Sequence, residues 1–262
     1  KETIDSGAQL ILTCDTGISA HDAVQYAQDR GVDVIVTDHH DLPANLPNAF
    51  TLVNPKFLPE GHPLAALSGV GVAYKLAELL LAQSDGSIPA SDLLDLTALG
   101  LVADLATLVH DTRYLTQKGI QQLRNTPRLG LNVLFEQAGI DPQALNESHI
   151  GFTIGPRLNS IGRLGDANPI VDFLLTDDSQ KVSVIANQLE SYNAQRRLLT
   201  AQVTQAAEAQ LREEPELLEA PIIIVKHPAW PAGVLGIAAA RLVERYHKPA
   251  VVLATPPGKP AH

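Results

Sequence analysis

The strongest constraint on the fold is a pair of short apolar segments, each closed by an acidic residue, with a helical segment between them. Residues 8–15 (AQLILTCD) and 32–38 (VDVIVTD) have the near-continuous apolar character of strands buried on both faces of a sheet. Residues 19–31 have helical spacing, with Ser19 placed to cap the helix and Gly31 placed to end it. A strand, a helix and a strand in about thirty residues form a βαβ unit, and therefore a parallel sheet with a right-handed crossover.

The middle of the chain is predicted to be mainly helical. A Pro-rich loop is expected at residues 41–64, before the first of these helices. Residues 149–169 are rich in Gly, Asn and Pro, so they are predicted to form loop and turn. The helices themselves are expected at residues 68–83, 91–108, 113–125 and 130–139.

The last third of the chain is predicted to contain one long helix and a second α/β region. No Gly or Pro occurs from Asp178 to Glu214, which predicts a helix roughly 50 Å long at a rise of 1.5 Å per residue. Strands are expected at residues 220–230 and 250–254, on either side of a helix at residues 231–249.

Taken together, these elements predict an α/β fold with two domains. The first is a doubly wound parallel-sheet domain at residues 1–176, and a linker helix at residues 177–215 joins it to a smaller α/β domain at residues 216–262. The chain does not begin with Met, and the second domain would have only about 45 residues, which is short. Both ends are therefore expected to be truncated.

Composition narrows the class of protein. The single cysteine, Cys14, cannot form an internal disulfide and excludes a multi-cysteine zinc site, which fits a reducing cytoplasm. No apolar run is long enough to cross a bilayer, and the first residues lack the pattern of a signal peptide. A formal net charge of −10 argues against binding nucleic acid over the whole surface, but it is compatible with one local groove.

Metal-ligand residue types follow both predicted strands. Asp15 ends the first strand, and Asp38, His39 and His40 follow the second. Ligands bind at the carboxyl ends of strands in open parallel sheets, so Asp15 and His39 would converge if the strands are neighbours. Carboxylate and imidazole ligands without sulfur suit Mn²⁺, Fe²⁺, Zn²⁺ or Mg²⁺, with a preference for Mn²⁺. An aspartate that bridges two such ions is a common arrangement for attack at phosphorus.

Each of these residues also has a simpler interpretation. Asp15 could cap the following helix, and His39 and His40 could be loop histidines bonded to the backbone. The metal site is favoured because both predicted strands are followed by residues that can bind a metal. Asp104 is an acid in an otherwise apolar segment, where an unpaired carboxylate would be costly to bury. Its spacing leaves open whether it caps a helix or lies near His39.

Arg157, Asn159 and Arg163 lie in the predicted Gly- and Asn-rich turn. Arginines there could bind phosphate in bidentate fashion, or they could tie loop carbonyls together between the two domains. Ser68 and the glycines after it (SGVG) are interpreted as a helix cap with close helix packing, because the full pattern of a phosphate-binding loop is missing.

Five segments occur in an order that resembles the DHH phosphoesterase superfamily, and within it the bacterial exonucleases specific for single-stranded DNA. The resemblance covers essentially the whole chain, because residues 229–253 also resemble the start of the accessory DHHA-type domain. The five segments are ILTCDTGI (11–18), VIVTDHH (34–40), LSGVGVAYKL (67–76), ALGLVADLATL (98–108) and IGPRLNSIGRL (154–164).

The resemblance implies a 5′→3′ exonuclease that hydrolyses phosphodiester bonds of single-stranded DNA with two Mn²⁺ or Mg²⁺ ions, in DNA repair and recombination. By position, Asp15 matches an aspartate that bridges both ions, and His39 and Asp104 match further metal ligands. Asp38 matches a residue that supports the ligand histidine, and His40 matches one close to the scissile phosphate. The implied catalytic residues are therefore Asp15, Asp38, His39 and His40.

The same resemblance implies the partners and assigns the arginine segment. Arg157, Asn159 and Arg163 would bind DNA or its 5′ phosphate. The substrate would be single-stranded DNA, and no membrane would be involved. A single-strand-binding protein or a helicase would be a possible protein partner. The protein itself would be a cytoplasmic monomer.

The chain also departs from the family pattern. An Asp-x-Asp motif is expected before Lys1 and a Gly/Ser/Arg-rich motif after His262, so the chain by itself should be an incomplete, inactive nuclease. Pro231 stands where the family tends to have histidine. Two alternatives remain open: another phosphoesterase of the superfamily, such as an oligoribonuclease or a cyclic-dinucleotide phosphodiesterase, and a non-catalytic replication scaffold.

Overall fold

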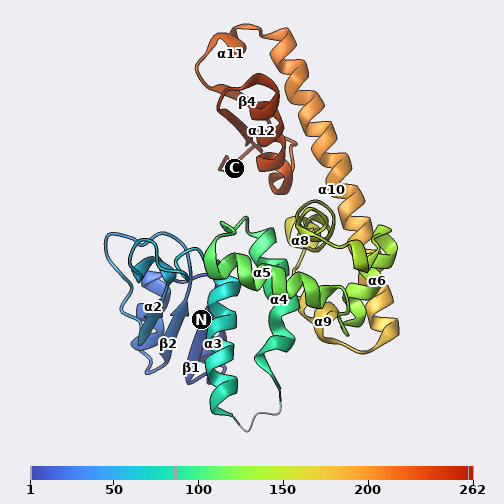
Figure 1. Cartoon of the computed structure of the whole chain (residues 1–262). Coiled ribbons are helices and arrows are strands. Elements are labelled where there is room, and N and C mark those ends of the chain that lie inside the picture. The colour runs from blue at the N-terminus through green and yellow to red at the C-terminus, as the bar shows by residue number, and fades with distance from the viewer. Residues whose placement is uncertain (1, 85–87, 259, 262) are drawn as a thin grey trace. The chain divides into compact units, whose positions relative to one another are not determined.

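The computed structural model describes residues 2–84, 88–258 and 260–261 (Figure 1). It confirms a mixed α/β fold with parallel sheets and one long helix. Within these ranges, no helix combines the length and the apolar character that a membrane span requires.

The chain divides into two compact units. The first unit contains residues 1–127 and 138–155, and the second contains residues 128–137 and 156–262. The predicted domain boundaries, at residues 176 and 216, stay a prediction.

A small parallel sheet begins the first unit (Figure 1). Its described strands lie in the order β1-β2-β3, and the register of the first pair runs from Leu10↔Asp33 to Cys14↔Thr37. The valines of β2 pack with Val24 of α2 in one apolar cluster. The elements are α1 (Glu2–Asp5), β1 (Leu10–Cys14), α2 (His21–Gln28), β2 (Asp33–Thr37) and β3 (Thr51–Val53).

The rest of the first unit is helical. Helices α4 and α5 pack closely against each other, and α3 packs against α4 through Gly71, where an added Cβ would lie 3.3 Å from Leu101. The elements are η1 (Pro55–Phe57), α3 (Gly69–Gln83), η2 (Ala90–Leu93), α4 (Leu94–Ala103), α5 (His110–Leu123), η3 (Pro142–Ala144), α7 (Glu147–His149) and the π-helix η4 (Ile150–Ile154).

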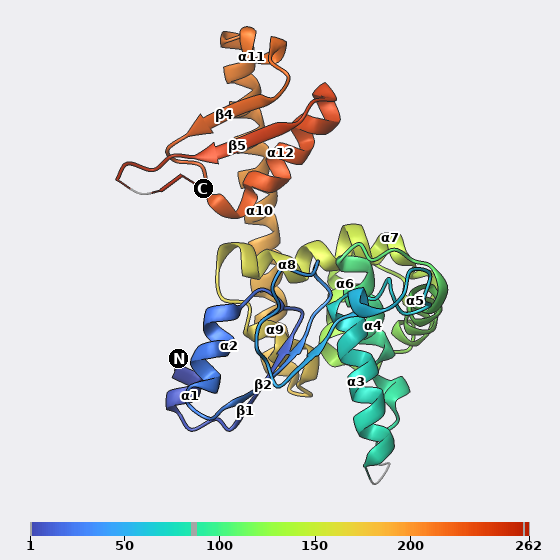
Figure 2. The same cartoon turned by 90° about the vertical axis from the view of Figure 1, so that its left-hand side faces the viewer.

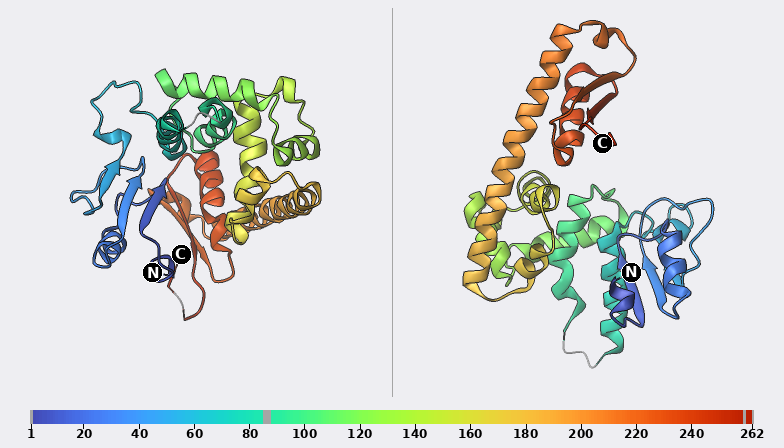
Figure 3. Two further views of the ribbon diagram at one scale, coloured as in Figure 1. Left: turned by 90° about the horizontal axis from the view of Figure 1, so that it is seen from below. Right: turned by 180° about the vertical axis from the view of Figure 1, so that it is seen from behind.

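The second unit is built on the long helix α10, which runs without a break from Ser179 to Glu213 (Figure 3). Its C-terminal half packs on α12 and on the parallel pair β4-β5 (Figure 2). Trp230 belongs to this apolar core. The elements are α6 (Leu129–Ala138), α8 (Gly155–Leu164), α9 (Pro169–Leu175), α10 (Ser179–Glu213), α11 (Glu216–Glu219), β4 (Ile223–His227), α12 (Ala232–Tyr246) and β5 (Ala250–Ala254).

Two sequence predictions near the sheet were wrong. Helix α2 begins two residues after Ser19, with Ala20 at the N-cap position and no side-chain cap bond. The predicted Pro-rich loop contains the strand β3, which pairs with β2 from Ile35↔Thr51 to Thr37↔Val53. A three-residue strand is too short to show a periodic pattern, so only the edge offered by β2 identifies it.

The prediction of loop and turn at residues 149–169 was also wrong. Most of this segment is helical, as η4 and then α8. Ile150, Ile154 and Ile161 are buried, so apolar packing outweighs the local preference of the Gly and Pro residues. The π-helical turn comes just before Pro156, whose missing N–H removes one helical hydrogen bond. Arg157, Asn159 and Arg163 are therefore helical residues.

Candidate metal centre

The site lies at the carboxyl ends of β1 and β2. Asp15 follows β1 directly, and its N–H donates to Thr37 O at 3.0 Å. Asp38 follows β2, and its N–H donates to Val53 O at 3.0 Å. The parallel ladder therefore continues one residue past each strand and brings the two loops together. Asp104 reaches the same place from the C-cap position of α4.

Asp15 does not cap a helix, because α2 begins only at His21. It has a φ of 63°, in the left-handed region that non-glycine residues rarely adopt. Hydrogen bonds from the strand ends hold this conformation: Thr13 Oγ1 donates to Thr16 O, and Thr37 Oγ1 donates to Thr13 O, both at 2.6 Å. Backbone strain of this kind is concentrated at functional sites.

The three predicted metal ligands meet at the ring of His39. Its Nε2 lies 2.9 Å from Asp15 Oδ1 and 3.5 Å from Asp104 Oδ2. Nε2 is buried, yet it makes no hydrogen bond of acceptable geometry with any described residue. This buried ring nitrogen has no hydrogen-bond partner among the described residues and lies beside two carboxylates. Such an arrangement fits a divalent cation that takes N and O ligands. The residues present therefore fit Mn²⁺ or Mg²⁺.

Asp38 is buried, unlike Asp15 and Asp104, and its carboxylate accepts hydrogen bonds from the surrounding backbone. Its Oδ2 accepts from Ile18 N at 2.9 Å, and its Oδ1 accepts from the backbone N–H groups of His39 and His40. Burial by itself raises the pKa of Asp38, but the hydrogen bonds from Ile18, the His40 ring and the two backbone N–H groups outweigh it and leave the pKa below its usual value. Asp38 thus joins the loop after β1 to the end of β2.

The predicted support of the His39 ring by Asp38 is indirect. Asp38 contacts the backbone of His39, and its side-chain partner is the ring of His40, with Oδ1 2.6 Å from Nδ1. This hydrogen bond, together with the charges of Asp38, Asp15 and Asp104, raises the pKa of His40 although burial lowers it. The rings of His39 and His40 lie 4.5 Å apart, and ligand atoms of Asp15, His39 and His40 are all within 4.8 Å of one another.

The N-terminus of α3 meets the Asp15 carboxylate at Gly69. A Cβ added there would lie 2.3 Å from Asp15 Oδ1 and 2.5 Å from Asp15 Cβ. Helix N-termini favour negative charge, so the Asp15 carboxylate lies at the favourable end of α3. Ser68 takes the predicted N-cap position, but its buried hydroxyl makes no hydrogen bond with a described residue. This role of Gly69 was not predicted from the sequence, although a glycine directly after the cap residue was a signal for it.

Gly69→Ala is expected to weaken Mn²⁺ binding by about tenfold, because the new methyl group must displace the Asp15 carboxylate. The effect is measured by titrating free Mn²⁺ with electron paramagnetic resonance. Gly236→Ala, in α12, is the matched control, because a Cβ there has no neighbour within 4 Å. Equal Mn²⁺ affinity of the two variants would contradict the packing of α3 against Asp15.

Arg157, Asn159 and Arg163 belong to the second unit, whereas the three carboxylate and imidazole ligands belong to the first. Arg157 forms an ion pair with Glu190 of α10, with Nε 2.5 Å from Oε1. Arg163 is exposed, and its Nη1 donates to Gly233 O at 3.3 Å. Asn159 is exposed. Each arginine therefore joins α8 to another helix of its unit.

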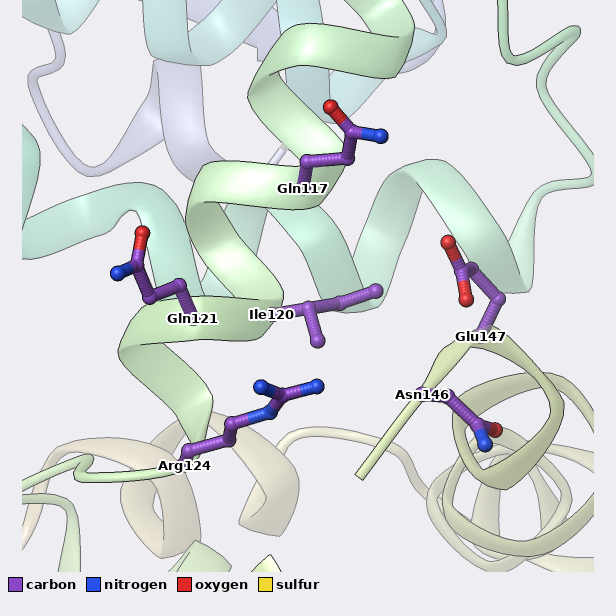
Figure 4. Close-up of a pocket in the computed structure, with 6 residues that line it drawn as sticks. All are labelled: Gln117, Ile120, Gln121, Arg124, Asn146 and Glu147. Carbon is purple, nitrogen blue, oxygen red and sulfur yellow. The ribbon is translucent and has the colours of Figure 1, made fainter. Parts of the chain in front are cut away.

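A separate hollow of about 240 Å³ lies between α5 and the start of α7 (Figure 4). Gln117, Gln121 and Arg124 line it from α5, facing Asn146 and Glu147 (Figure 4). Arg124 is held in place by a bond from Nη2 to Leu145 O at 3.0 Å. None of the predicted ligands lines this hollow, so it is distinct from the metal site.

Comparison with known proteins supports the resemblance seen in the sequence. The model of the DHH family, N-terminal domain, matches residues 2–101. The single-stranded-DNA-specific exonuclease RecJ of Bacillus subtilis is 39% identical over 249 residues, which covers 95% of this chain and 31% of the relative. The chain thus spans about a third of that protein's length.

Solved structures give the same result. A crystal structure of exonuclease RecJ bound to manganese matches with a TM-score of 0.81 at 32% identity, covering 97% of this chain and 63% of that one. RecJ from Thermus thermophilus in complex with Mg²⁺ matches with a TM-score of 0.71 at 32% identity, covering 94% of this chain and 34% of that one. The first part of the chain, residues 2–101, therefore matches the DHH family, N-terminal domain, and the chain as a whole is similar to RecJ exonucleases.

Proposed function

We propose that this chain carries the metal centre of a 5′→3′ exonuclease specific for single-stranded DNA, acting in DNA repair and recombination. The observation that carries the proposal is the convergence of Asp15, His39 and Asp104 at the carboxyl ends of two parallel strands. The relatives support the substrate and the metal, because they are named as single-stranded-DNA exonucleases and have been solved with Mn²⁺ or Mg²⁺.

In this proposal Asp15, His39 and Asp104 would hold the metal, and Asp15 would serve as a ligand for both ions if two are bound. Divalent ions at this site would activate water and neutralise the charge that develops on the phosphoryl oxygens. Asp38 fixes the loops that carry Asp15 and His39, and it holds Nδ1 of His40. The side chain of His40 is more exposed than that of His39, so we assign His40 to contact the scissile phosphate.

The same proposal assigns phosphate contacts to Arg157, Asn159 and Arg163. Asn159 and Arg163 are exposed and can reach a ligand directly. Arg157 is half-buried and paired with Glu190, so it would act mainly by fixing α8. Charge-assisted bonds from guanidinium groups to phosphate are strong and directional, which suits them to holding a flexible strand.

Several finer features are part of the proposal. The exposed Leu10 and Leu12 of β1 support a sheet that continues beyond this strand into a doubly wound domain. The unit formed by β4, α12 and β5 would be the start of a DHHA-type accessory domain, with α10 as the linker. We further propose a cytoplasmic monomer that works with a single-strand-binding protein or a helicase.

We also propose that this chain alone has little nuclease activity. The described residues gather three ligating side chains, Asp15, His39 and Asp104, whereas two divalent ions usually take four or more protein ligands and waters. The test compares the 262-residue chain with the same chain joined to the flanking segments of the Bacillus subtilis relative. Both are given 5′-phosphorylated single-stranded DNA and short RNA oligomers, with Mn²⁺.

The joined protein is expected to degrade the DNA in a metal-dependent way and to lose this activity with His39→Ala. Cleavage of the short RNA only would indicate a different phosphoesterase of the same superfamily. A folded, joined protein that cuts neither substrate would indicate a scaffold. Efficient cleavage by the 262-residue chain alone would contradict the expected lack of ligands.

A further inference from the structure

A cluster of five arginines lies in the second unit, on three different helices. Arg157 and Arg163 belong to α8, Arg196 and Arg197 to α10, and Arg241 to α12. They are close enough for the charges of the other four to act on Arg196. Such a concentration of positive charge is unexpected in a chain with a formal net charge of −10.

Packing between the three helices holds the cluster together. Glu190 of α10 pairs with Arg157, and Arg163 Nη1 donates to Gly233 O at the start of α12. A Cβ added at Gly233 would lie 2.2 Å from Arg163 O, so the end of α8 rests directly on α12. Helix α12 in turn packs along α10. The arginines are thus brought together by the core of the unit rather than by flexible loops.

Arg196 is the most constrained member of the cluster. Its Nη2 donates to Oδ1 of the buried Asn193 at 2.8 Å, whereas its Nε is buried and has no hydrogen-bond partner. Burial, followed by the charges of Arg163, Arg197, Arg241 and Arg157, lowers the pKa of Arg196. A half-buried guanidinium with an unused donor, among like charges, is stabilised when an anion binds beside it.

Little negative charge compensates the cluster. In the part of the chain that the structure describes, Glu190 neutralises Arg157, but Arg163, Arg196, Arg197 and Arg241 make no ion pair with a carboxylate. Four cationic groups on three helices can contact more than one phosphate at once, which a single small anion would not require.

An open hollow next to Arg163 indicates which kind of anion fits. It has a volume of about 480 Å³ and belongs wholly to the second unit. Leu158, Ile170 and Val171 give it an apolar lining, and Asn159 and Arg163 give it polar groups. An apolar hollow beside a phosphate-binding group can accept a base or a sugar, whereas an acidic peptide would not need it.

We propose that Arg196, Arg197 and Arg241, together with Arg163, bind consecutive backbone phosphates of a single-stranded nucleic acid. This proposal rests on the proposed function and extends it, because it adds α10 and α12 to the DNA-binding surface. The phosphates lie against the guanidinium groups, and one nucleoside occupies the hollow beside Arg163. Binding through the backbone is independent of base sequence.

The test measures binding without catalysis. Fluorescence anisotropy of a labelled 15-residue oligo-dT is followed with the 262-residue chain in EDTA, over a series of KCl concentrations. Arg196→Gln and Arg241→Gln are each expected to lower the affinity about tenfold and to reduce the slope of log affinity against log salt by about one. Arg212→Gln is the matched control, because Arg212 is exposed on the last turn of α10 and lies outside the cluster.

The control should change the affinity by less than about twofold. Cluster variants that bind like the control would overturn the proposal, and so would competition by polyglutamate as strong as that by unlabelled oligo-dT. Circular dichroism checks that each variant is folded. If Arg196→Gln unfolds, the affinity of Arg241→Gln tests the proposal, because Arg241 is exposed. Because EDTA removes the metal, a failure of the metal centre would appear in the hydrolysis assay and leave this binding result unchanged.

Discussion

Asp15→Asn and His39→Ala are each expected to weaken Mn²⁺ binding by the chain on the order of 100-fold. His39 Nε2 lies 2.9 Å from Asp15 Oδ1. His39→Ala removes the nitrogen donor at this point, and Asp15→Asn removes the negative charge and one of the two carboxylate oxygens. The affinity is measured by titrating Mn²⁺ and following the free ion by electron paramagnetic resonance.

His21→Ala and Asp22→Asn are the matched controls for these two variants. Both residues are exposed in the first turn of α2, and neither is among the grouped ligand residues. The controls should leave the Mn²⁺ affinity unchanged. Asp15 and His39 variants that bind Mn²⁺ as tightly as the unaltered chain would show that the ion binds elsewhere.

Asp38→Ala is expected to lower the free energy of unfolding by about 3–5 kcal/mol. The Asp38 side chain is almost fully buried and accepts hydrogen bonds from Ile18 N and from the backbone of His39 and His40. Alanine leaves these donors without an acceptor and opens a small cavity. The change is measured by urea denaturation followed by circular dichroism.

Asp33→Ala is the control for this substitution, since Asp33 is the exposed first residue of the same strand and should change stability by less than about 1 kcal/mol. Asp38→Asn should fall between the two, because its amide keeps one acceptor oxygen. An Asp38→Ala protein as stable as Asp33→Ala would mean that Asp38 does not hold the two loops together.

Elements with a strong local signal could be predicted from the sequence. The strands β1 and β2 are mostly apolar, and α10 has no Gly or Pro over 35 residues. The place of Asp15 and His39 followed from this, because parallel neighbouring strands must end at the same edge of the sheet. The distance of 2.9 Å between their side chains agrees with that expectation.

Features that depend on packing between distant segments could not be predicted in this way. Asp104 reaches His39 only because α4 ends beside the sheet, and nothing in its spacing indicates this. The segment of η4 and α8 is helical although its sequence has the Gly and Pro content of a turn, because its buried isoleucines determine the conformation. Arg196 and Arg241 are 45 residues apart in sequence, so no local motif shows that the charge of Arg241 acts on Arg196.

The nitrogen ligand of the metal tests the central claim most directly. Electron spin-echo envelope modulation of Mn²⁺ bound to the chain is expected to show ¹⁴N coupling from a directly ligated imidazole. His39→Ala should abolish this coupling, and His40→Ala should retain it, because the proposed ligands are Asp15, His39 and Asp104, whereas His40 is assigned to the phosphate. Coupling that survives in His39→Ala, or that is absent from the unaltered chain with Mn²⁺ bound, would contradict a metal centre built on His39.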